Sequence, residues 1–238
     1  MARPDALSAL RGDVCAANKE LAERGLARFT FGNASAIDRE AGLVVIKPSG
    51  VPYETMRPAH LVVVDLDGTV VEGSLRPSSD LATHLELYRA FEQIGGVVHT
   101  HSRYATIWAQ AQREIPCLGT THADYFHGPV PVTAHLAPGD IESEYEANTG
   151  REIVRRFANL DPVHMPAVLV AGHASFCWGL TVAAAVETAD LLEEIAHMAY
   201  GTLTLDAAAD PLPSALLDKH FLRKHGPAAY YGQTDGSR

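Results

Sequence analysis

The sequence lacks the features that mark secreted, membrane-spanning and nucleic-acid-binding proteins. It holds only 3 cysteines in 238 residues, and none form a C-x-x-C pair, so we expect a reducing compartment and no disulfide framework. No apolar run approaches the roughly 20 residues that span a membrane, and no apolar h-region follows the first residues, so no signal peptide is predicted. A formal net charge of −10 argues against nucleic acids and anionic membranes as partners. These absences together predict a cytoplasmic protein.

The chain also lacks the glycine-rich motifs that bind nucleotides, since neither G-x-x-x-x-G-K-[ST] nor G-x-G-x-x-G occurs in it. No internal repeat and no linker-like stretch divides it. A content of 47% hydrophobic and 20% charged residues is ordinary for a globular protein that buries a substantial core. We therefore expect a single domain over residues 1–238.

Helical and extended patterns alternate along the chain, which indicates a mixed α/β fold. The expected helices cover residues 4–24, a segment that opens at 78–80, a segment around 107–111, and residues 139–160, 181–203 and 214–224. The expected strands cover residues 28–37, 43–47, 61–66, 69–72, a segment that ends near 99, and 167–178. Asp67-Gly68 predicts a hairpin turn, so the sheet is not expected to be purely parallel.

A pair of histidines, two residues apart, ends one of the apolar segments. His99 and His101 belong to the stretch Gly95-Gly96-Val97-Val98-His99-Thr100-His101-Ser102. Side chains i and i+2 of a strand project from the same face, so both imidazoles would point at one place. Neutral imidazole nitrogen suits zinc and similar divalent transition metals. Two ligands do not hold a metal, and the pair alone is equally consistent with two polar residues at a strand end.

Two further residues could complete a metal site. His173 follows an apolar run and a glycine, in the same local setting as His99. Asp80 stands after two serines at a predicted helix start, where an acid is typical of a cap or of a first turn favoured by the helix dipole. Beside three imidazoles, its carboxylate would instead complete a His₃–carboxylate set. His84, one turn after Asp80, falls on the apolar side of the predicted helix and is interpreted as structural.

Three short polar loops are typical of small-anion binders. They combine glycines, hydroxyls, an amide and a lysine with a predicted helix start, whose free N–H groups attract phosphate. Each alone would be an ordinary turn, but together with a metal site they suggest a phosphorylated substrate. The loops are Phe31-Gly32-Asn33-Ala34-Ser35, Lys47-Pro48-Ser49-Gly50 and Pro77-Ser78-Ser79-Asp80.

These motifs, taken in order, resemble the class II aldolase and adducin family over nearly the whole chain. The resemblance is carried by 32–35 (GNAS), 47–50 (KPSG), 77–80 (PSSD), 99–102 (HTHS) and His173. Further segments are similar to the L-ribulose-5-phosphate 4-epimerases of that family, namely 103–110 (RYATIWAQ), 119–126 (GTTHADYF), 217–226 (LDKHFLRKHG) and 229–233 (AYYGQ). The chain departs from the family at 171–175 (AGHAS), where a second histidine and a glycine are expected, although the ligand position itself is kept.

The resemblance implies a fold, a metal and a set of roles. The implied fold is one three-layer α/β/α domain with a mostly antiparallel central sheet. The implied assembly is a C4 homotetramer with active sites between subunits, each reached by a neighbour's tail of about residues 226–238. One zinc ion per subunit is implied, with Mn²⁺ or Co²⁺ as alternatives. The implied metal ligands are Asp80, His99, His101 and His173, the acid/base pair is Asp124 and Tyr231, and the sugar-phosphate contacts are Gly32, Asn33, Lys47, Ser49, Gly50, Ser78 and Ser79.

The implied activity is the interconversion of L-ribulose 5-phosphate and D-xylulose 5-phosphate. The C4 proton of these sugars is not acidic, because the carbonyl is at C2, so the family breaks and re-forms the C3–C4 bond. A metal Lewis acid stabilises the enediolate of dihydroxyacetone. Glycolaldehyde phosphate turns its carbonyl face before recapture, so two acid/base groups are needed on opposite sides of the aldehyde.

Simpler interpretations of the same residues remain open at this point. Asp124 could be a loop acid, Tyr231 a packed tail aromatic, and the basic residues of 220–225 a solvated helix face. Two other functions are also compatible with the motifs. One is a class II aldolase that releases its fragments, such as one acting on L-fuculose 1-phosphate. The other is a non-catalytic, adducin-like interaction module, which is disfavoured because such members are expected to lack the ligand histidines.

Overall fold

The chain folds around one sheet of seven strands, which run in the order β4-β3-β2-β1-β5-β7-β6. The computed structural model describes residues 4–231. All neighbouring strands are antiparallel, which confirms the expected mostly antiparallel sheet. The strands are β1 (Asn33–Asp38), β2 (Leu43–Ile46), β3 (Val62–Asp65), β4 (Val70–Glu72), β5 (Gly96–Thr100), β6 (Ala167–Leu169) and β7 (Ser175–Gly179).

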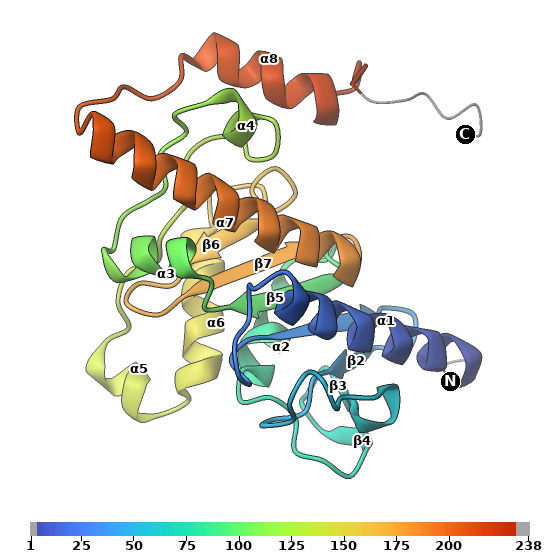
Figure 1. Ribbon diagram of the computed structural model, residues 1–238. Helices are drawn as coiled ribbons and strands as arrows, with labels where there is room; N and C mark the ends of the chain where they lie inside the picture. The colour runs from blue at the N-terminus through green and yellow to red at the C-terminus, as the bar shows by residue number, and fades with distance from the viewer. Residues whose placement is uncertain (1–3, 232–238) are drawn as a thin grey trace.

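Helices cover both faces of this sheet, as expected for a three-layer α/β/α arrangement (Figure 1). On one side α1 packs on β1 and α7 packs on β5 and β7, while α2 and α6 pack together on the other side. The helices are α1 (Pro4–Glu23), α2 (Leu81–Ala90), α3 (Arg103–Gln110), α4 (Thr120–Ala123), α5 (Pro138–Glu142), α6 (Tyr145–Arg156), α7 (Val182–Leu205), α8 (Ser214–His225) and the 3₁₀ helix η1 (Pro58–His60).

Consecutive residues of β1 show how the two layers are held. Ala34 exchanges hydrogen bonds with the side chain of Asn18 in α1, while Ser35 Oγ contacts His84 and Tyr88 in α2. Asn18 therefore holds α1 to the backbone of β1, whereas the Ser35 side chain holds α2. Because both faces are covered, β2 and β3 are rich in apolar residues; Val44, Val45 and Ile46 of β2 and Val62, Val63 and Val64 of β3 are fully buried.

The two glycines before the histidine motif let α7 lie directly on β5. A Cβ on Gly95 would come within 2.1 Å of the Leu180 carbonyl oxygen, and one on Gly96 within 2.4 Å of Val182 Cα. No side chain fits at either position without moving the backbone of the neighbouring segment. The strand that carries His99 is therefore fixed against the longest helix of the described chain.

Three expected elements differ from the structure. The strand expected over 28–37 begins only at Asn33, because Phe29 and Gly32 have positive φ angles of 55° and 82° and turn the chain. The helix expected over 139–160 is two helices, α5 and α6, since Ser143 has φ −103° and ψ −114°, and α6 ends at Arg156. The strand expected over 167–178 is divided into β6 and β7 by a tight turn.

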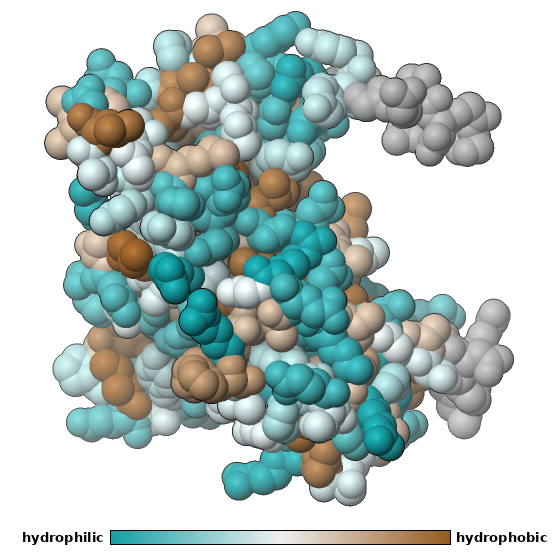
Figure 2. All heavy atoms as spheres, in the orientation of Figure 1, coloured by the Kyte–Doolittle hydropathy of each residue, from teal (hydrophilic) through white to brown (hydrophobic). Residues whose placement is uncertain are grey.

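The surface is mixed in character. Figure 2 shows one face on which hydrophilic residues alternate with separate hydrophobic patches. Among the described residues, no helix combines the length and apolarity that a membrane crossing needs.

Candidate metal centre

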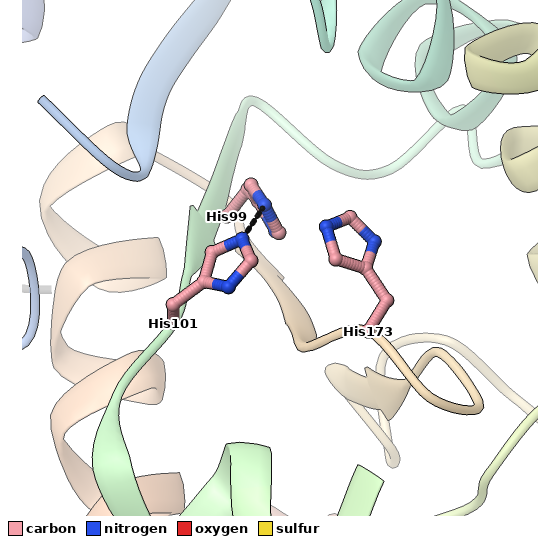
Figure 3. A group of neighbouring side chains, drawn as sticks. All are labelled: His99, His101 and His173. Carbon is pink, nitrogen blue, oxygen red and sulfur yellow. Dashed lines mark hydrogen bonds between the residues drawn. The ribbon is translucent and has the colours of Figure 1, made fainter. Parts of the chain in front are cut away.

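The two histidines of the first motif converge as their spacing predicted. His99 lies in β5, opposite Asn33 of β1 and Phe176 of β7, and His101 follows the end of the strand. Their Nε2 atoms lie 3.1 Å apart, and Figure 3 shows the two rings turned toward one another. The His99 ring also stacks on Phe176, with centroids 4.3 Å apart, which fixes its plane.

His173 joins this pair from the turn between β6 and β7. Its ring centroid lies 5.0 Å from that of His99 and 4.9 Å from that of His101 (Figure 3). Each of the three residues offers a ligand atom within 4.8 Å of the other two. The turn closes with a hydrogen bond from Val170 N–H to the Ala174 carbonyl over 2.8 Å, and Gly172 supplies the positive φ of 72° that it needs.

The chemistry of the donor set fits a divalent transition metal. His99 Nδ1 donates to the Ser175 carbonyl over 2.9 Å, so in neutral His99 the lone pair lies on Nε2, the atom that faces His101. Two nitrogens bound tetrahedrally to one zinc ion at about 2.0–2.1 Å would lie about 3.3 Å apart. The observed separation of 3.1 Å matches that value.

Burial keeps these imidazoles neutral, which is the form that binds metal. Burial lowers the pKa of His99 to about 3 and is also the main cause of the lowered pKa values of His101 and His173. The charge of Asp80 acts in the opposite direction on the pKa values of all three histidines. At neutral pH a cation therefore does not have to displace protons from these nitrogens.

Asp80 is oriented by side chains rather than by the helix that follows it. It occupies the N-cap position of α2, but its carboxylate makes no cap hydrogen bond. Instead its Oδ2 atom accepts from Asn33 Nδ2 over 2.6 Å and from Ser78 Oγ over 3.4 Å. Among the described residues, the three histidines form the one group of three or more possible metal ligands whose ligand atoms all lie within 4.8 Å of one another, and Asp80 is not part of it. Asp80 as the fourth ligand thus stays a prediction.

The three polar loops meet beside the histidines. Ser78 N–H donates to the Lys47 carbonyl and Ser49 N–H donates to the Arg76 carbonyl, each over 2.9 Å. Asn33 Nδ2 donates to Ser78 Oγ over 3.0 Å, which ties the first loop to the third. The loops that the sequence marked as separate anion binders are therefore one structural unit.

The residues of this unit differ in how they can meet a ligand. Ser49, Gly50 and Ser79 are exposed, whereas Lys47 is buried, with its ammonium 5.0 Å from the centre of the Tyr53 ring. Burial lowers the pKa of Lys47. Position 32 requires glycine because the backbone of β5 lies so close that a Cβ there would be 2.7 Å from the His99 carbonyl oxygen. Direct contact of any of these residues with a phosphate stays a prediction.

A second charged group surrounds Asp124 at the end of α4. Arg223 donates to Asp124 Oδ1 over 3.0 Å and to Oδ2 over 2.7 Å, and His220 Nδ1 donates to Oδ1 over 3.0 Å. Lys224 Nζ lies 3.8 Å from Oδ2. Burial alone would raise the pKa of Asp124, but the hydrogen bonds from Arg223 and His220 and the charge of Lys224 outweigh it and lower that pKa.

Tyr231 lies on the same two cations as Asp124. Its ring centre is 4.8 Å from the Arg223 guanidinium carbon and 4.5 Å from Lys224 Nζ, and its backbone N–H donates to the Arg223 carbonyl over 3.1 Å. Asp124 and Tyr231 are thus brought together, far apart though they are in sequence. The rest of the tail motif, Gly232 and Gln233, lies outside the described residues.

Some residues that support the site were not identified from the sequence. The Tyr53 hydroxyl holds the first polar loop through the carbonyls of Phe31 and Gly32, over 2.7 and 2.8 Å. No local pattern marks this tyrosine, because its partners are backbone atoms 21 and 22 residues away. His84 is fully buried and its Nδ1 contacts Ser35 Oγ over 2.7 Å, in agreement with the structural interpretation.

Known proteins resemble this chain in sequence and in fold. Residues 12–200 match the family described as "Class II Aldolase and Adducin N-terminal domain". The structure of an L-fuculose 1-phosphate aldolase matches with a TM-score of 0.76 and 26% identity, over 92% of this chain and 96% of that one. YgbL from Klebsiella pneumoniae and YgbL from Escherichia coli each match with a TM-score of 0.70 and 24% identity, over 90% of this chain and 98% of theirs.

Proposed function

The chain belongs to the class II aldolase and adducin family, and from that premise we propose that it is a metal-dependent epimerase of pentulose 5-phosphates. The proposed reaction interconverts L-ribulose 5-phosphate and D-xylulose 5-phosphate through cleavage and re-formation of the C3–C4 bond. The family match, which covers residues 12–200, supports an enzyme of the aldolase type. The choice of an epimerase within the family rests on the residues around Asp124.

The observation that carries this choice is the meeting of Asp124 and Tyr231 on Arg223. Arg223 hydrogen-bonds the carboxylate of one and lies under the ring of the other. Inverting C4 requires a proton-transfer group for each orientation of the C4 hydroxyl. A carboxylate and a phenol supply two groups of suitable type, and we propose that the aldehyde binds between them, with one group on each of its faces.

The proposed steps balance without an added reagent. One of the two groups accepts the proton of the C4 hydroxyl, the C3–C4 bond breaks, and its electron pair moves toward the C2 oxygen. C4 thereby becomes the aldehyde carbon of glycolaldehyde phosphate. After this aldehyde has turned, C3 attacks its opposite face, and the second group donates a proton to the C4 oxygen. The proton held by the first group then returns to the second through water, which restores both groups.

The remaining residues hold the reactants during these steps. His99, His101 and His173, with Asp80 as the proposed fourth ligand, would hold one Zn²⁺ per subunit, or Mn²⁺ or Co²⁺ in its place. Such an ion supplies Lewis-acid stabilisation of the enediolate. Gly32, Asn33, Ser49, Gly50, Ser78 and Ser79 are proposed to bind the phosphate, with the charge of Lys47 beneath them, so that the aldehyde turns without escaping.

We propose that the active site is shared between subunits of a C4 homotetramer. Within residues 4–231 of one chain, no hydrogen bond or ring contact joins Asp124 or Tyr231 to the three histidines. Asp124 and Tyr231 of one chain instead lie together, and Figure 1 shows α4 and α8 next to each other above α7, at the top of the view. One subunit would therefore give both groups, and with them its tail, to the metal centre of a neighbour.

Mixed tetramers test this arrangement. Chains with His99→Ala keep Asp124 and Tyr231, whereas chains with Asp124→Asn keep the histidines, so their mixture should recover activity that neither has alone. A mixture of Asp124→Asn and Tyr231→Phe chains should recover none. Recovery in the second mixture and not in the first would contradict the proposal that one subunit gives both groups.

The second candidate function is an aldolase that releases its products. It is favoured by the match to an L-fuculose 1-phosphate aldolase at 26% identity. Incubation with L-ribulose 5-phosphate separates the two, because an epimerase forms D-xylulose 5-phosphate and an aldolase accumulates dihydroxyacetone and glycolaldehyde phosphate. Turnover of L-fuculose 1-phosphate without turnover of the pentulose would replace the epimerase by the aldolase.

A further inference from the structure

A carboxylate from another helix caps the start of α3. Tyr104 N–H donates to Glu193 Oε1 over 2.8 Å and to Oε2 over 3.0 Å, and Ala105 N–H donates to Oε2 over 3.0 Å. Glu193 belongs to α7, 88 and 89 residues further along the chain. These N–H groups belong to the first turn of α3, which has no partner for them within the helix, and a negative charge there is favoured by the helix dipole.

The serine that occupies the usual capping position does not perform this role. Ser102 is the N-cap residue of α3, but its side chain makes no cap hydrogen bond. Its Oγ atom is buried and has no partner among the described residues. A serine before a helix ordinarily accepts from the second or third N–H of that helix. Here Glu193 has taken those donors.

Two more contacts fix α3 to the same stretch of α7. The Tyr104 ring stacks on His197 at 3.9 Å with an interplanar angle of 9°. Trp108 Nε1 donates to the Ala196 carbonyl over 2.9 Å. Glu193, Ala196 and His197 lie within about one turn of α7, so α3 cannot shift without breaking all three contacts at once.

This anchoring acts on His101, the most exposed of the three proposed metal ligands. His99 lies inside β5 and is held by the Ser175 carbonyl, and His173 lies in a closed turn. His101 is exposed, follows the end of β5, and has no side-chain hydrogen bond within the described chain except that to His99. Its backbone runs directly into α3, which begins at Arg103.

We propose that Glu193 is a positioning residue of the metal centre, which places His101 by capping α3. The inference rests on the proposed function in one respect, since it requires the three histidines to hold a metal. Metal ligands must be placed to within a fraction of an ångström, and removal of groups that orient ligands typically lowers metal affinity about 10–100-fold. Within the described chain the Glu193 carboxylate hydrogen-bonds α3 and neither the metal ligands nor the proposed acid/base pair, so we assign its effect to the placement of α3.

The test compares two capping variants with two matched controls. Glu193→Ala removes the carboxylate, and Glu193→Gln keeps its shape while replacing one acceptor by a donor. Glu194→Gln changes the adjacent exposed acid, and Ser102→Ala removes the hydroxyl that does not cap. Each protein is freed of metal and titrated with Co²⁺ against a chromophoric chelator, at a temperature where its unfolding curve shows it to be folded.

We expect Glu193→Ala to weaken Co²⁺ binding about tenfold or more and to alter the visible absorption of the bound ion, which reports ligand geometry. Glu193→Gln should change the Co²⁺ affinity and the absorption in the same direction but to a smaller extent. The two control variants should match the parent protein in both measurements. Parent-like affinity and absorption in both Glu193 variants would overturn the inference, even if Glu193→Ala unfolds at a lower temperature. An equal effect of Ser102→Ala or Glu194→Gln would also overturn it. Failure of the parent itself to bind Co²⁺ would reject the metal site, a result distinguishable from failure of the Glu193 inference alone.

Discussion

Asn33 lies directly opposite His99 across β1 and β5, and its side-chain amide holds the carboxylate of Asp80 over 2.6 Å. One residue thus connects the strand that carries His99, the proposed fourth ligand and the third polar loop, which it reaches through Ser78. Its Oδ1 atom is buried and has no partner among the described residues. The amide therefore orients Asp80 from inside the site.

Replacement of Asn33 should loosen Asp80. In Asn33→Ala the carboxylate loses its shortest hydrogen bond, and we expect metal affinity to fall about tenfold, as for other residues that orient ligands. Asn33→Asp should be worse, because two carboxylates would then face each other at the same distance. Chelator competition measures both, with Asn148→Ala, an amide in α6, as the control. Unchanged affinity in both Asn33 variants would show that Asp80 is not a ligand.

Removal of His99 should remove the metal and the activity together. Its Nε2 faces His101, and of the three histidines only His101 and His173 would be left to bind a cation. We expect less than one tenth of the parent's metal content in His99→Ala after dialysis, by elemental analysis. His164→Ala changes a half-exposed histidine outside the group and should keep full content. Full occupancy in His99→Ala would refute the assignment of the centre.

Asp124→Asn should abolish epimerisation and leave the metal bound. Loss of one proton-transfer group typically costs about 10²–10⁴-fold in rate. The control is Asp218→Asn, since Asp218 also helps to hold α8, through His127 over 2.8 Å, but is not proposed to transfer protons. A coupled assay for D-xylulose 5-phosphate gives the rates. Equal losses in the two variants would mean that Asp124 only docks α8.

Alanine at Ser79 should raise KM and change kcat little. The hydroxyl is exposed beside the loop unit, and a contact made equally in the ground and transition states affects binding alone. Ser49→Ala should act in the same way, whereas Ser78→Ala should also disturb Asn33 and Asp80, which its hydroxyl contacts. Ser74→Ala serves as the control from the same surface loop. Steady-state kinetics that are unchanged in all three serine variants would remove the phosphate assignment.

The metal-free protein should lose stability as the pH falls, in part through His122. Burial is the main cause of the lowering of its pKa to about 4, below the usual 6.5, so between these values the unfolded chain binds a proton that the folded chain does not. Stability is therefore highest above pH 6.5 and falls toward pH 4, by roughly 1.4 kcal/mol per pH unit for this histidine. His122→Gln should flatten the dependence by that amount in urea unfolding with chelator present. An unchanged slope would contradict the assigned pKa.

The sequence predicted strands and helices best where the pattern of apolar residues typical of one kind of element continued without a break. The apolar runs of β2 and β3 and the long pattern of α7 fall close to their expected positions. The breaks were missed, because each depends on one backbone angle that residue type does not dictate. Phe29 is the clearest case, since a positive φ is uncommon for a bulky residue. In the same way, the turn at Gly172 was missed because it lies within residues 167–178, a largely apolar run whose pattern predicts one continuous strand.

The candidate site also contains residues that a local sequence pattern predicts and residues that only the packing of the fold brings together. The convergence of His99 and His101 follows from strand geometry, so their spacing was sufficient to predict it. The addition of His173 depends on the pairing of β5 with β7, and the capping of α3 by Glu193 depends on how α7 packs. Contacts of this kind join residues some 75 to 90 positions apart, and no local pattern in one sequence encodes them.

The interlocking of the polar loops bears on how a substrate is captured. Ser49 and Ser78 are fixed by backbone hydrogen bonds to Arg76 and Lys47 within the protein alone, so these loops exist in one shape before any phosphate arrives. Little conformational entropy is then lost on binding, which leaves more of the interaction energy for affinity. The long-range field of a protein of net charge −10 opposes the approach of the proposed sugar phosphate, and this repulsion weakens as salt is added.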